Sequence, residues 1–376
     1  MDSRVPKVLS LFLLLASAAS QTASEAILLE QQGKLADAVE AWRGVTKQDP
    51  KNAAAFASMG VDLSRLGEYE DAASAYRRAL ALNPRLPGLH LNLGLAEFKQ
   101  SHFSGAISPL SAAVISNPTD FQARTLLGLS YYGARKFAEA SKHLSLALKS
   151  DPDNTQLRQF LAQSCLWAKQ YVCARNQFRE ILRRDPNSAS AHMLTGQALD
   201  GLGQTSDAIV EFKSAAEMAP GEPNVHFGLG YLYWKSHQYD DAAREFRAEL
   251  ANDPTHAQSL AHLGDIEMKR ENTEEAVTLL RKAIAQQDNV RIAYIDLGAI
   301  LMKKKQYADA VVAFRRGVAL DPTEADAHYR LARAYQALGM KAESQKEFAS
   351  VRTLHQKAFN EDITSKMSTA PPPISK

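Results

Sequence analysis

The sequence lacks the short motifs by which many enzymes and metal sites are recognised. It contains no H-E-x-x-H pair for zinc, no G-x-x-x-x-G-K loop for phosphate, no G-x-S-x-G nucleophile and no paired Cys-x-x-Cys. Four of its ten histidines recur at one position of the repeat described below, too far apart for a single metal ion: His90, His192, His226 and His328. We therefore expect a protein that is not an enzyme and that holds no cofactor and no metal.

An excess of charge of one sign is also absent. The 44 lysine and arginine residues nearly balance the 42 aspartate and glutamate residues, which leaves a net charge of only +2. A nucleic-acid binder would normally carry a strong basic excess, so we expect no nucleic-acid partner. Apolar residues make up 45% of the chain, which is enough to supply a core.

The N-terminus has the layout of a secretory signal peptide over residues 1–20. Arg4 and Lys7 precede the apolar run from Val8 to Ala16, and small residues follow. The run is too short to cross a bilayer as a stable anchor, so we expect cleavage between Ala18 and Gln21 and export to the periplasm or beyond. The alternative is an uncleaved N-terminal tether. Any other membrane contact would come through a partner.

Four kinds of residue recur along the chain with a period of 34. The proline column is interrupted only at Asp288 and comprises Pro50, Pro84, Pro118, Pro152, Pro186, Pro220, Pro254 and Pro322. The glycine column comprises Gly60, Gly94, Gly128, Gly196, Gly230, Gly264 and Gly298. An alanine column runs from Ala38 to Ala310, and a column of large apolar residues runs from Trp42 to Phe348.

The stretch from Ala53 to Leu86 shows what one period encodes. Apolar and small residues fall three or four positions apart in each half, the spacing that places them on a single helical face. Gly67 between the halves can end the first helix in a left-handed conformation, and Pro84 ends the second. A glycine facing an alanine lets the two helices approach closely, and the bulky residue one turn later fills the gap toward the next pair.

These columns resemble the tetratricopeptide repeat family in period and in small, aromatic and terminal proline positions. The resemblance implies an all-α fold, a right-handed superhelical solenoid of about ten helix-turn-helix repeats. Asp288, in place of proline, and Glu249, in place of a small residue, depart from the family pattern. The array over residues 21–358 is expected to comprise repeats 21–52, 53–86, 87–120, 121–154, 155–188, 189–222, 223–256, 257–290, 291–324 and 325–358. The polar end, residues 359–376, is expected to be a disordered tail.

The resemblance also implies a binding surface. In the family, positions 2, 5, 9, 12 and 13 of the first helices line a concave groove. Here those positions carry aromatic, aliphatic and amide side chains: Leu95, Phe98, Gln122, Leu129, Tyr132, Gln156, Gln159, Gln163, Trp167, Met193, Gln197, Phe227, Tyr231 and Trp234. Apolar pockets can hold the side chains of an extended peptide while amides pair with its backbone. Alternatively, the aromatic residues only pack between neighbouring first helices.

The function that follows is an exported, non-enzymatic scaffold that binds a protein or peptide segment in the concave groove. Its role would be the assembly of an envelope or secretion complex. We expect the strongest contributions to binding from Tyr132, Trp167 and Trp234. The alternative is an accessory glycan-binding subunit of an envelope polysaccharide machine, in which the groove stacks on sugar rings.

The two cysteines, Cys165 and Cys173, lie on either side of the turn in the fifth repeat. One is near the end of the first helix and the other near the start of the second, so their side chains could meet. In an oxidising compartment they could form a disulfide. The alternative is two small apolar residues in a tightly packed place.

Overall fold

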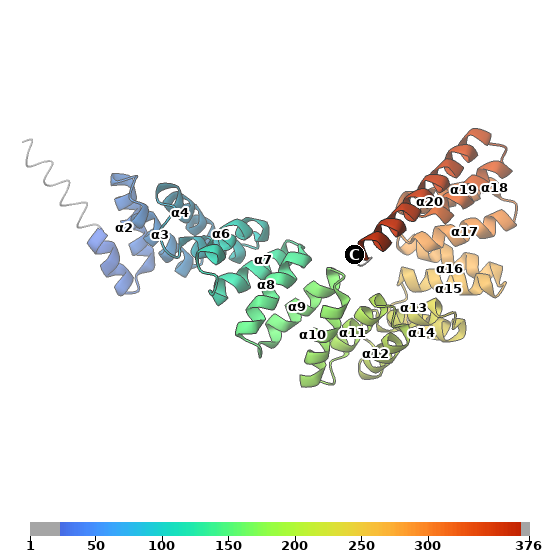
Figure 1. The fold of residues 1–376 in the computed structure, drawn as a ribbon, viewed down its shortest axis with the longest axis horizontal. Helices are drawn as coiled ribbons and strands as arrows, with labels where there is room; N and C mark the ends of the chain where they lie inside the picture. The colour runs from blue at the N-terminus through green and yellow to red at the C-terminus, as the bar shows by residue number, and fades with distance from the viewer. Residues whose placement is uncertain (1–22, 370–376) are drawn as a thin grey trace, which may run out of the picture. The chain divides into compact units, whose positions relative to one another are not determined.

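The computed structural model describes residues 23–369, and every regular element in that range is a helix (Figure 1). The all-α helical repeat solenoid predicted from the sequence is confirmed. The predicted signal peptide, residues 1–20, lies outside the described residues, as do residues 370–376. None of the described helices combines the length and apolar character needed to cross a membrane.

The helices follow one another in pairs, one pair for each repeat. The first members of the pairs are a helix over residues 23–31, α3 (Ala53–Leu66), α5 (Leu89–Lys99), α7 (Phe121–Gly133), α9 (Thr155–Trp167), α11 (Ala189–Gly201), α13 (Val225–Lys235), α15 (Ala257–Lys269), α17 (Arg291–Lys303) and α19 (Ala325–Ala337). The second members are α2 (Leu35–Gln48), α4 (Tyr69–Leu82), α6 (Phe103–Ser116), α8 (Phe137–Ser150), α10 (Tyr171–Arg184), α12 (Thr205–Met218), α14 (Tyr239–Asn252), α16 (Thr273–Gln286), α18 (Tyr307–Leu320) and α20 (Lys341–Thr369).

Side chains at the repeat joints cap several first helices. The amide oxygen of Asn154 accepts a hydrogen bond from the N–H of Leu157 at 2.9 Å, and the hydroxyl of Ser188 accepts one from Ala191 at 3.3 Å. A helix start leaves its first N–H groups without helical partners, so a side-chain acceptor stabilises the start at that residue. These caps therefore fix where those repeats begin.

The turn inside each pair places one residue in the left-handed conformation. Glycine occupies this position four times, at Gly33, Gly67, Gly203 and Gly339. Six other turns hold a residue with a side chain there: Ser101, Arg135, Lys169, His237, Glu271 and Lys305. A Cβ atom disfavours this conformation, so these six turns are held by the packing of the helices around them.

The glycine column lies against the large apolar column of the same repeat. A Cβ atom at Gly60 would be 2.6 Å from the Tyr76 ring, and one at Gly298 would be 2.6 Å from the Phe314 ring. These rings are seated on the glycine of their own repeat, and members of the column such as Phe212 also reach the first helix of the next pair, as we expected of the bulky residue. Only glycine leaves room for a contact this close.

The described chain divides into two compact bodies, an N-terminal body that ends at Pro186 and a C-terminal body that begins at Asn187. Each has its own buried apolar clusters, such as those around Tyr76 in the first body and Phe246 in the second. A repeat array has no single core, because each repeat packs on its neighbours alone. Two bodies can therefore arise within a continuous series of repeats.

The last helix is longer than the repeat pattern predicts. Because α20 continues to Thr369, residues 359–369 are helical and do not belong to a disordered tail as we expected. This segment contains no glycine or proline that would end a helix until Pro371, which disfavours helix at the residue before it. Figure 1 shows α20 extending past the end of α19.

Candidate functional site

Aromatic rings gather around the C-terminal ends of α7 and α9 in the N-terminal body. The Trp167 ring lies 5.6 Å from Tyr132 and 4.9 Å from Phe137, measured between ring centroids. A hollow of about 600 Å³ opens beside these rings and is lined by Tyr132, Gly133, Arg135, Phe137 and Trp167, which we term the aromatic hollow. Aromatic walls of this kind hold apolar groups of a ligand.

The aromatic hollow is open to solvent on one side. Trp167 is 50% exposed, which is unusual for so large an apolar side chain. The Tyr132 hydroxyl donates a hydrogen bond of 2.6 Å to the amide oxygen of Gln163, and burial raises the pKa of Tyr132 above its ordinary value. Tyr132 is therefore neutral and held in one orientation, while Trp167 presents a free face.

The repeat geometry explains why these residues meet. Gly133 and Trp167 occupy the same position in successive repeats, so stacking of α7 on α9 brings them near each other. A Cβ atom at Gly133 would be 2.4 Å from the Phe103 ring, so this position requires glycine. Arg135 is the left-handed residue of the turn, and Phe137 begins α8 two residues later.

A second hollow of about 430 Å³ lies between α11 and α13 in the C-terminal body, and we term it the glycine hollow. Its floor includes Gly228, where a Cβ atom would be 2.2 Å from the Phe212 ring. The same ring would meet a Cβ atom at Gly196 at 2.6 Å, so Phe212 contacts first helices of two successive repeats. The lining comprises Met193, Gln197, Asp200, Phe212, Pro223, Asn224, Phe227, Gly228, Tyr231 and Leu232.

Glu249 caps the start of α13. Asn224 is in the left-handed conformation, so its helix begins only at Val225. The buried carboxylate of Glu249 accepts hydrogen bonds from the N–H groups of Asn224 at 2.9 Å and Phe227 at 3.0 Å. The departure from the family pattern noted in the sequence is therefore a cap that positions a wall of the glycine hollow.

An ion pair closes one edge of the glycine hollow. Lys235 Nζ donates a hydrogen bond to Asp200 Oδ1 at 2.7 Å, and this bond raises the pKa of Lys235. Both side chains remain partly exposed. The rim thus presents a paired charge beside the amide of Gln197, while the interior stays apolar.

Trp234 lies beside a buried polar cluster and does not line either hollow. Its Nε1 donates a hydrogen bond of 2.6 Å to Asp265, which also pairs with Lys269. Burial lowers the pKa of the neighbouring His262 to about 4, and burial followed by the charge of Asp265 raises the pKa of Asp296 to about 7. Because Trp234 is hydrogen-bonded to Asp265 within this cluster, its ring is less available to a partner than that of Trp167.

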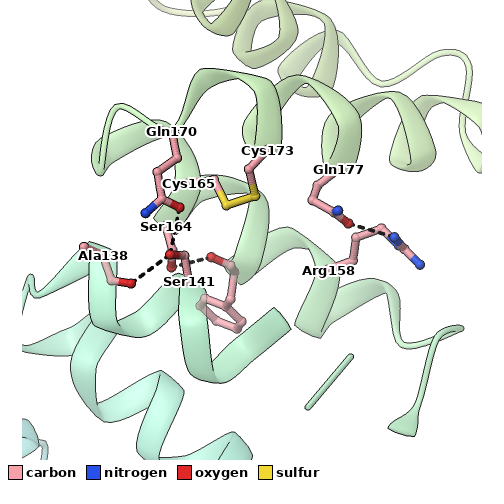
Figure 2. Close-up of a disulfide and its surroundings, with 9 residues drawn as sticks. Ala138, Ser141, Arg158, Ser164, Cys165, Gln170, Cys173 and Gln177 are labelled. Carbon is pink, nitrogen blue, oxygen red and sulfur yellow. Dashed lines mark hydrogen bonds between the residues drawn. A yellow bond between two sulfur atoms is a disulfide. The ribbon is translucent and has the colours of Figure 1, made fainter. Parts of the chain in front are cut away.

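The two cysteines are bonded to each other in the structure (Figure 2). Cys165 comes from α9 and Cys173 from α10, and their Cα atoms are 5.8 Å apart. Figure 2 also shows Ser141 of the preceding repeat, whose hydroxyl donates a hydrogen bond of 2.9 Å to the Gln170 side chain. The bridge therefore fastens the helix pair that carries Trp167.

Three of the recurring histidines pair with glutamates of their own repeat. His192 lies 2.6 Å from Glu211, and His226 lies 2.8 Å from Glu245. His328 makes the same contact with a glutamate nineteen residues later. These histidines join the two helices of a pair. Within residues 23–369 no three histidine, cysteine or acidic side chains converge on a possible metal site.

The structure brings some of the predicted groove residues together and separates others. Tyr132 and Trp167 line the aromatic hollow with Gln163 bonded beside it, and Met193, Gln197, Phe227 and Tyr231 line the glycine hollow. Phe98 instead packs against Phe103 of the second helix α6 in its own repeat, with ring centroids 5.5 Å apart. The remaining predicted residues do not line these two hollows: Leu95, Gln122, Leu129, Gln156 and Gln159. A role in binding stays a prediction for all of them.

Several lining residues were missed because the sequence reading used only selected positions of the first helices. Arg135 and Phe137 belong to a turn and a second helix, which those positions do not include. Gly228 could have been identified from the sequence, because it is the only glycine at the sixth position of any repeat from residue 53 onward. A glycine at a repeat position where the other repeats carry a side chain indicates a hollow. The sequence does not show, however, that the Phe212 ring packs against Gly228 at the bottom of that hollow.

Family models match most of the repeat array. Those described as tetratricopeptide repeat match residues 131–198, 174–223, 227–290 and 326–358. Those described as TPR repeat match residues 63–101 and 298–339. Together the matches span more than half of the chain. No curated protein matches it.

Several solved structures resemble the chain at low sequence identity. The APC/C hetero-tetramer Cut9–Hcn1 contains a chain that is 13% identical, with a TM-score of 0.52 and coverage of 91% of this chain and 82% of that one. Yeast Tom70 is 14% identical with a TM-score of 0.40, covering 94% and 100%. MamA is 22% identical with a TM-score of 0.37, covering 44% and 96%. Of these three, the likeness to the Cut9–Hcn1 chain bears on the fold, and at 13% identity it concerns the fold alone.

Proposed function

Because the chain belongs to the tetratricopeptide repeat family, we propose that it is an exported scaffold that binds an extended segment of a partner protein along the first helices of its repeats. One observation carries the proposal. Residues that the family pattern assigns to a groove gather at two hollows, one in each body, and both hollows have aromatic walls. A non-enzymatic role agrees with the family, whose members are generally scaffolds.

The two hollows suit different parts of a protein ligand. The aromatic hollow offers the exposed face of the Trp167 ring. An apolar side chain of a partner can pack on this face without a rearrangement of the helices that carry the ring. The glycine hollow combines the rings of Phe227 and Tyr231 with the amide of Gln197, which both donates and accepts hydrogen bonds. A peptide backbone needs both kinds of partner, so this combination favours a peptide over a purely apolar ligand.

Export is the second part of the proposal. It is supported by the signal layout of residues 1–20 and by the bond between Cys165 and Cys173, since disulfides persist in oxidising compartments. The N-terminal sequence of the protein isolated from its native cells tests it. A mature chain that begins at Ala19, Ser20 or Gln21 is expected, whereas a chain that retains Arg4 and Lys7 would support the membrane-tether alternative.

The test of binding uses the full chain as bait on native envelope proteins. One double variant combines Tyr132→Ala with Trp167→Ala, and a second combines Phe227→Ala with Tyr231→Ala. Ile115→Ala is the matched control, because Ile115 is 79% exposed and lines neither hollow. Circular dichroism on each variant checks that the helices are retained.

The segment of a captured partner that binds must then be mapped, and the affinity of each variant for that segment measured by titration. We expect each double variant to weaken the binding of that segment by at least about tenfold, because buried aromatic residues dominate such interfaces. The control should bind like the parent. If the two double variants bind the segment as tightly as the control, the binding site lies outside these hollows. Binding of soluble glycans, abolished by the Trp167 change, would instead support the glycan-binding alternative.

A further inference from the structure

A third hollow, of about 290 Å³, lies at the joint between repeats 53–86 and 87–120 in the N-terminal body, and we term it the joint hollow. Its walls include the loop Pro84–Gly88, His90 and Leu91 of α5, and Ala113 of α6. It shares no lining residue with the aromatic hollow or the glycine hollow.

The start of α5 has the same backbone conformation as the start of α13, but it lacks the carboxylate found there. Gly88 is left-handed with a φ of 73°, and Asn224, at the same repeat position, has a φ of 67°. In α13 the carboxylate of Glu249 accepts hydrogen bonds from the N–H groups of Asn224 and Phe227. In repeat 87–120 the position of Glu249 is held by Ala113, whose methyl group accepts no hydrogen bond.

Two N–H groups at the start of α5 are therefore left without an acceptor. They belong to Gly88 and Leu91, and neither is hydrogen-bonded within residues 23–369. Because Gly88, Leu91 and Ala113 all line the joint hollow, it lies at the place that corresponds to the Glu249 carboxylate. The helix dipole and the N–H groups at this place both favour an anion.

His90 is an independent sign of the same missing acid. The histidines at its position in other repeats, His192, His226 and His328, each contact the carboxylate of a glutamate nineteen residues later. For His90 that residue is Pro109, which has no carboxylate. The imidazole of His90 lines the joint hollow and can donate a hydrogen bond to a ligand there.

The other side chains of the joint hollow also suit an acidic ligand with an aliphatic stem. Arg85 contributes a guanidinium group to the lining. Asp120 contributes the opposite charge, but its Oδ1 already accepts a hydrogen bond from the N–H of Ala123 at 2.9 Å, where it caps α7. Leu86 and Leu91 supply apolar surface for methylene groups.

We propose that the joint hollow binds the side-chain carboxylate of a glutamate in a partner protein, which accepts hydrogen bonds from the N–H groups of Gly88 and Leu91 and from His90. Glutamate is favoured because Glu249 makes the corresponding backbone contacts from within the chain. The inference rests on the proposed function in one respect, that the glutamate belongs to a partner. The joint hollow itself is a separate site and adds a requirement for an acid to what the partner must carry.

The first test titrates the full chain with a capped glutamate residue, N-acetylglutamate N-methylamide, and follows the amide signals of Gly88 and Leu91 by NMR. We expect saturable shifts of both signals. The capped glutamine residue has the same shape without the charge, and it should bind at least about tenfold more weakly, because hydrogen bonds to an ionised acceptor are the stronger ones. N-acetylalanine, which carries a carboxylate at a chain end, should also bind more weakly than the capped glutamate.

Three variants locate the binding. Ala113→Glu supplies the acid from within the chain, as Glu249 does in α13, and should abolish binding of the capped glutamate. Ile115→Glu adds the same charge to α6 at a residue that is 79% exposed and outside the joint hollow, and should leave binding unchanged. His90→Ala should weaken binding without filling the joint hollow. Circular dichroism on each variant checks that the helices are retained.

The inference is overturned if the capped glutamate leaves both amide signals in place, or if the capped glutamine binds equally well. Undiminished binding to Ala113→Glu would also overturn it, as would tighter binding of N-acetylalanine, since the occupant would then be a chain end. The proposed function is judged separately. A partner segment that loses affinity through the double variants of the two other hollows supports the scaffold, even if all its glutamates can be changed to glutamine without effect, which would remove the partner's glutamate from the joint hollow.

Discussion

The sixth position of the repeat differs in chemistry from one repeat to the next in the C-terminal body. Gly228 leaves a hollow open, and His262 stacks on the Phe246 ring at a centroid distance of 5.3 Å. Asp296 is buried with no hydrogen-bond partner for its Oδ2 atom, whereas Arg330 pairs with Asp326 at the solvent side. One backbone position thus yields a cavity, an aromatic stack, a buried acid and a surface ion pair.

We predict that Gly228→Ala destabilises the protein by about 1 to 3 kcal/mol, because the added methyl group overlaps the Phe212 ring and forces it to move. Thermal unfolding followed by circular dichroism measures the loss. Gly221→Ala is the matched control, since a Cβ atom there meets nothing within 4 Å. Unfolding of the two variants at the same temperature would show that the ring can shift without cost.

We predict that Asp296→Asn changes how stability depends on pH. The folded state keeps Asp296 protonated up to about pH 7, whereas an unfolded aspartate ionises near pH 4. Its contribution is therefore complete below pH 4 and is lost as the pH rises through 7. Between pH 5 and pH 8 the parent should lose about 2 kcal/mol of unfolding free energy relative to the variant.

Denaturant unfolding at each pH provides the measurement. Burial also raises the pKa of Asp62, to about 6. Its effect on the pH dependence of stability is the same in parent and variant, so it cancels when the two profiles are compared. The other charges that act on Asp296 are those of Asp265, Lys269, Arg291 and Arg330. Asp309→Asn, at an exposed residue of α18, is the control and should keep the parent's profile. Parallel profiles for parent and Asp296→Asn would contradict the prediction.

Among the elements, the pair α9 and α10 is the one fastened by a covalent bond. Its turn is short, and Lys169 takes the left-handed position in it. The bond between Cys165 and Cys173 closes a loop with a sequence separation of 8. Since Trp167 lies inside this loop, the bond also limits the motion of one wall of the aromatic hollow.

We predict that reducing this bond lowers the unfolding free energy by about 2.5 kcal/mol, the loop-closure value for so short a loop. Unfolding of the parent with and without reductant measures the change. The variant Cys165→Ala, Cys173→Ala provides the control, because reductant should not affect it. Titration of thiols on unreduced, denatured protein should find none, and two reactive thiols there would contradict the bridge.

Helix pairs could be predicted from sequence because glycine and proline act locally. Gly67 ends α3 in the left-handed conformation, and the proline column falls between successive pairs. The hollows could be predicted only in part. Tyr132 and Trp167 follow from repeat position, but Phe137 enters the site from a second helix and Gly228 acts through a ring in the preceding repeat. Such contacts depend on how repeats pack, which the period alone does not contain.

On the scale of the whole molecule, stability is distributed among neighbouring repeats. Phe246 shows this distribution, since it is fully buried against Gly230 of its own repeat and His262 of the next. A contact that joins adjacent repeats has no direct effect on distant ones. Damage to the core is therefore expected to stay local.

We predict that Phe246→Ala costs about 3 to 5 kcal/mol, and that the loss is confined to the repeats nearest to it. Hydrogen exchange should become faster in α13, α14 and α15, while α3 and α4 of the other body keep the parent's rates. Leu110→Ala, in the N-terminal body, is the reciprocal control and should leave α13 to α15 unchanged. Equal acceleration along the whole chain would show that the array unfolds as one unit.

The left-handed turns have a consequence for how this sequence can evolve. Six of them hold a side chain where glycine would cost nothing, and each such conformation is unfavourable by about 1 to 2 kcal/mol. A single substitution to glycine at Lys169 or Lys305 would relieve that strain without touching the groove. Destabilising changes at the two hollows can therefore be offset by substitutions made one residue at a time elsewhere in the array.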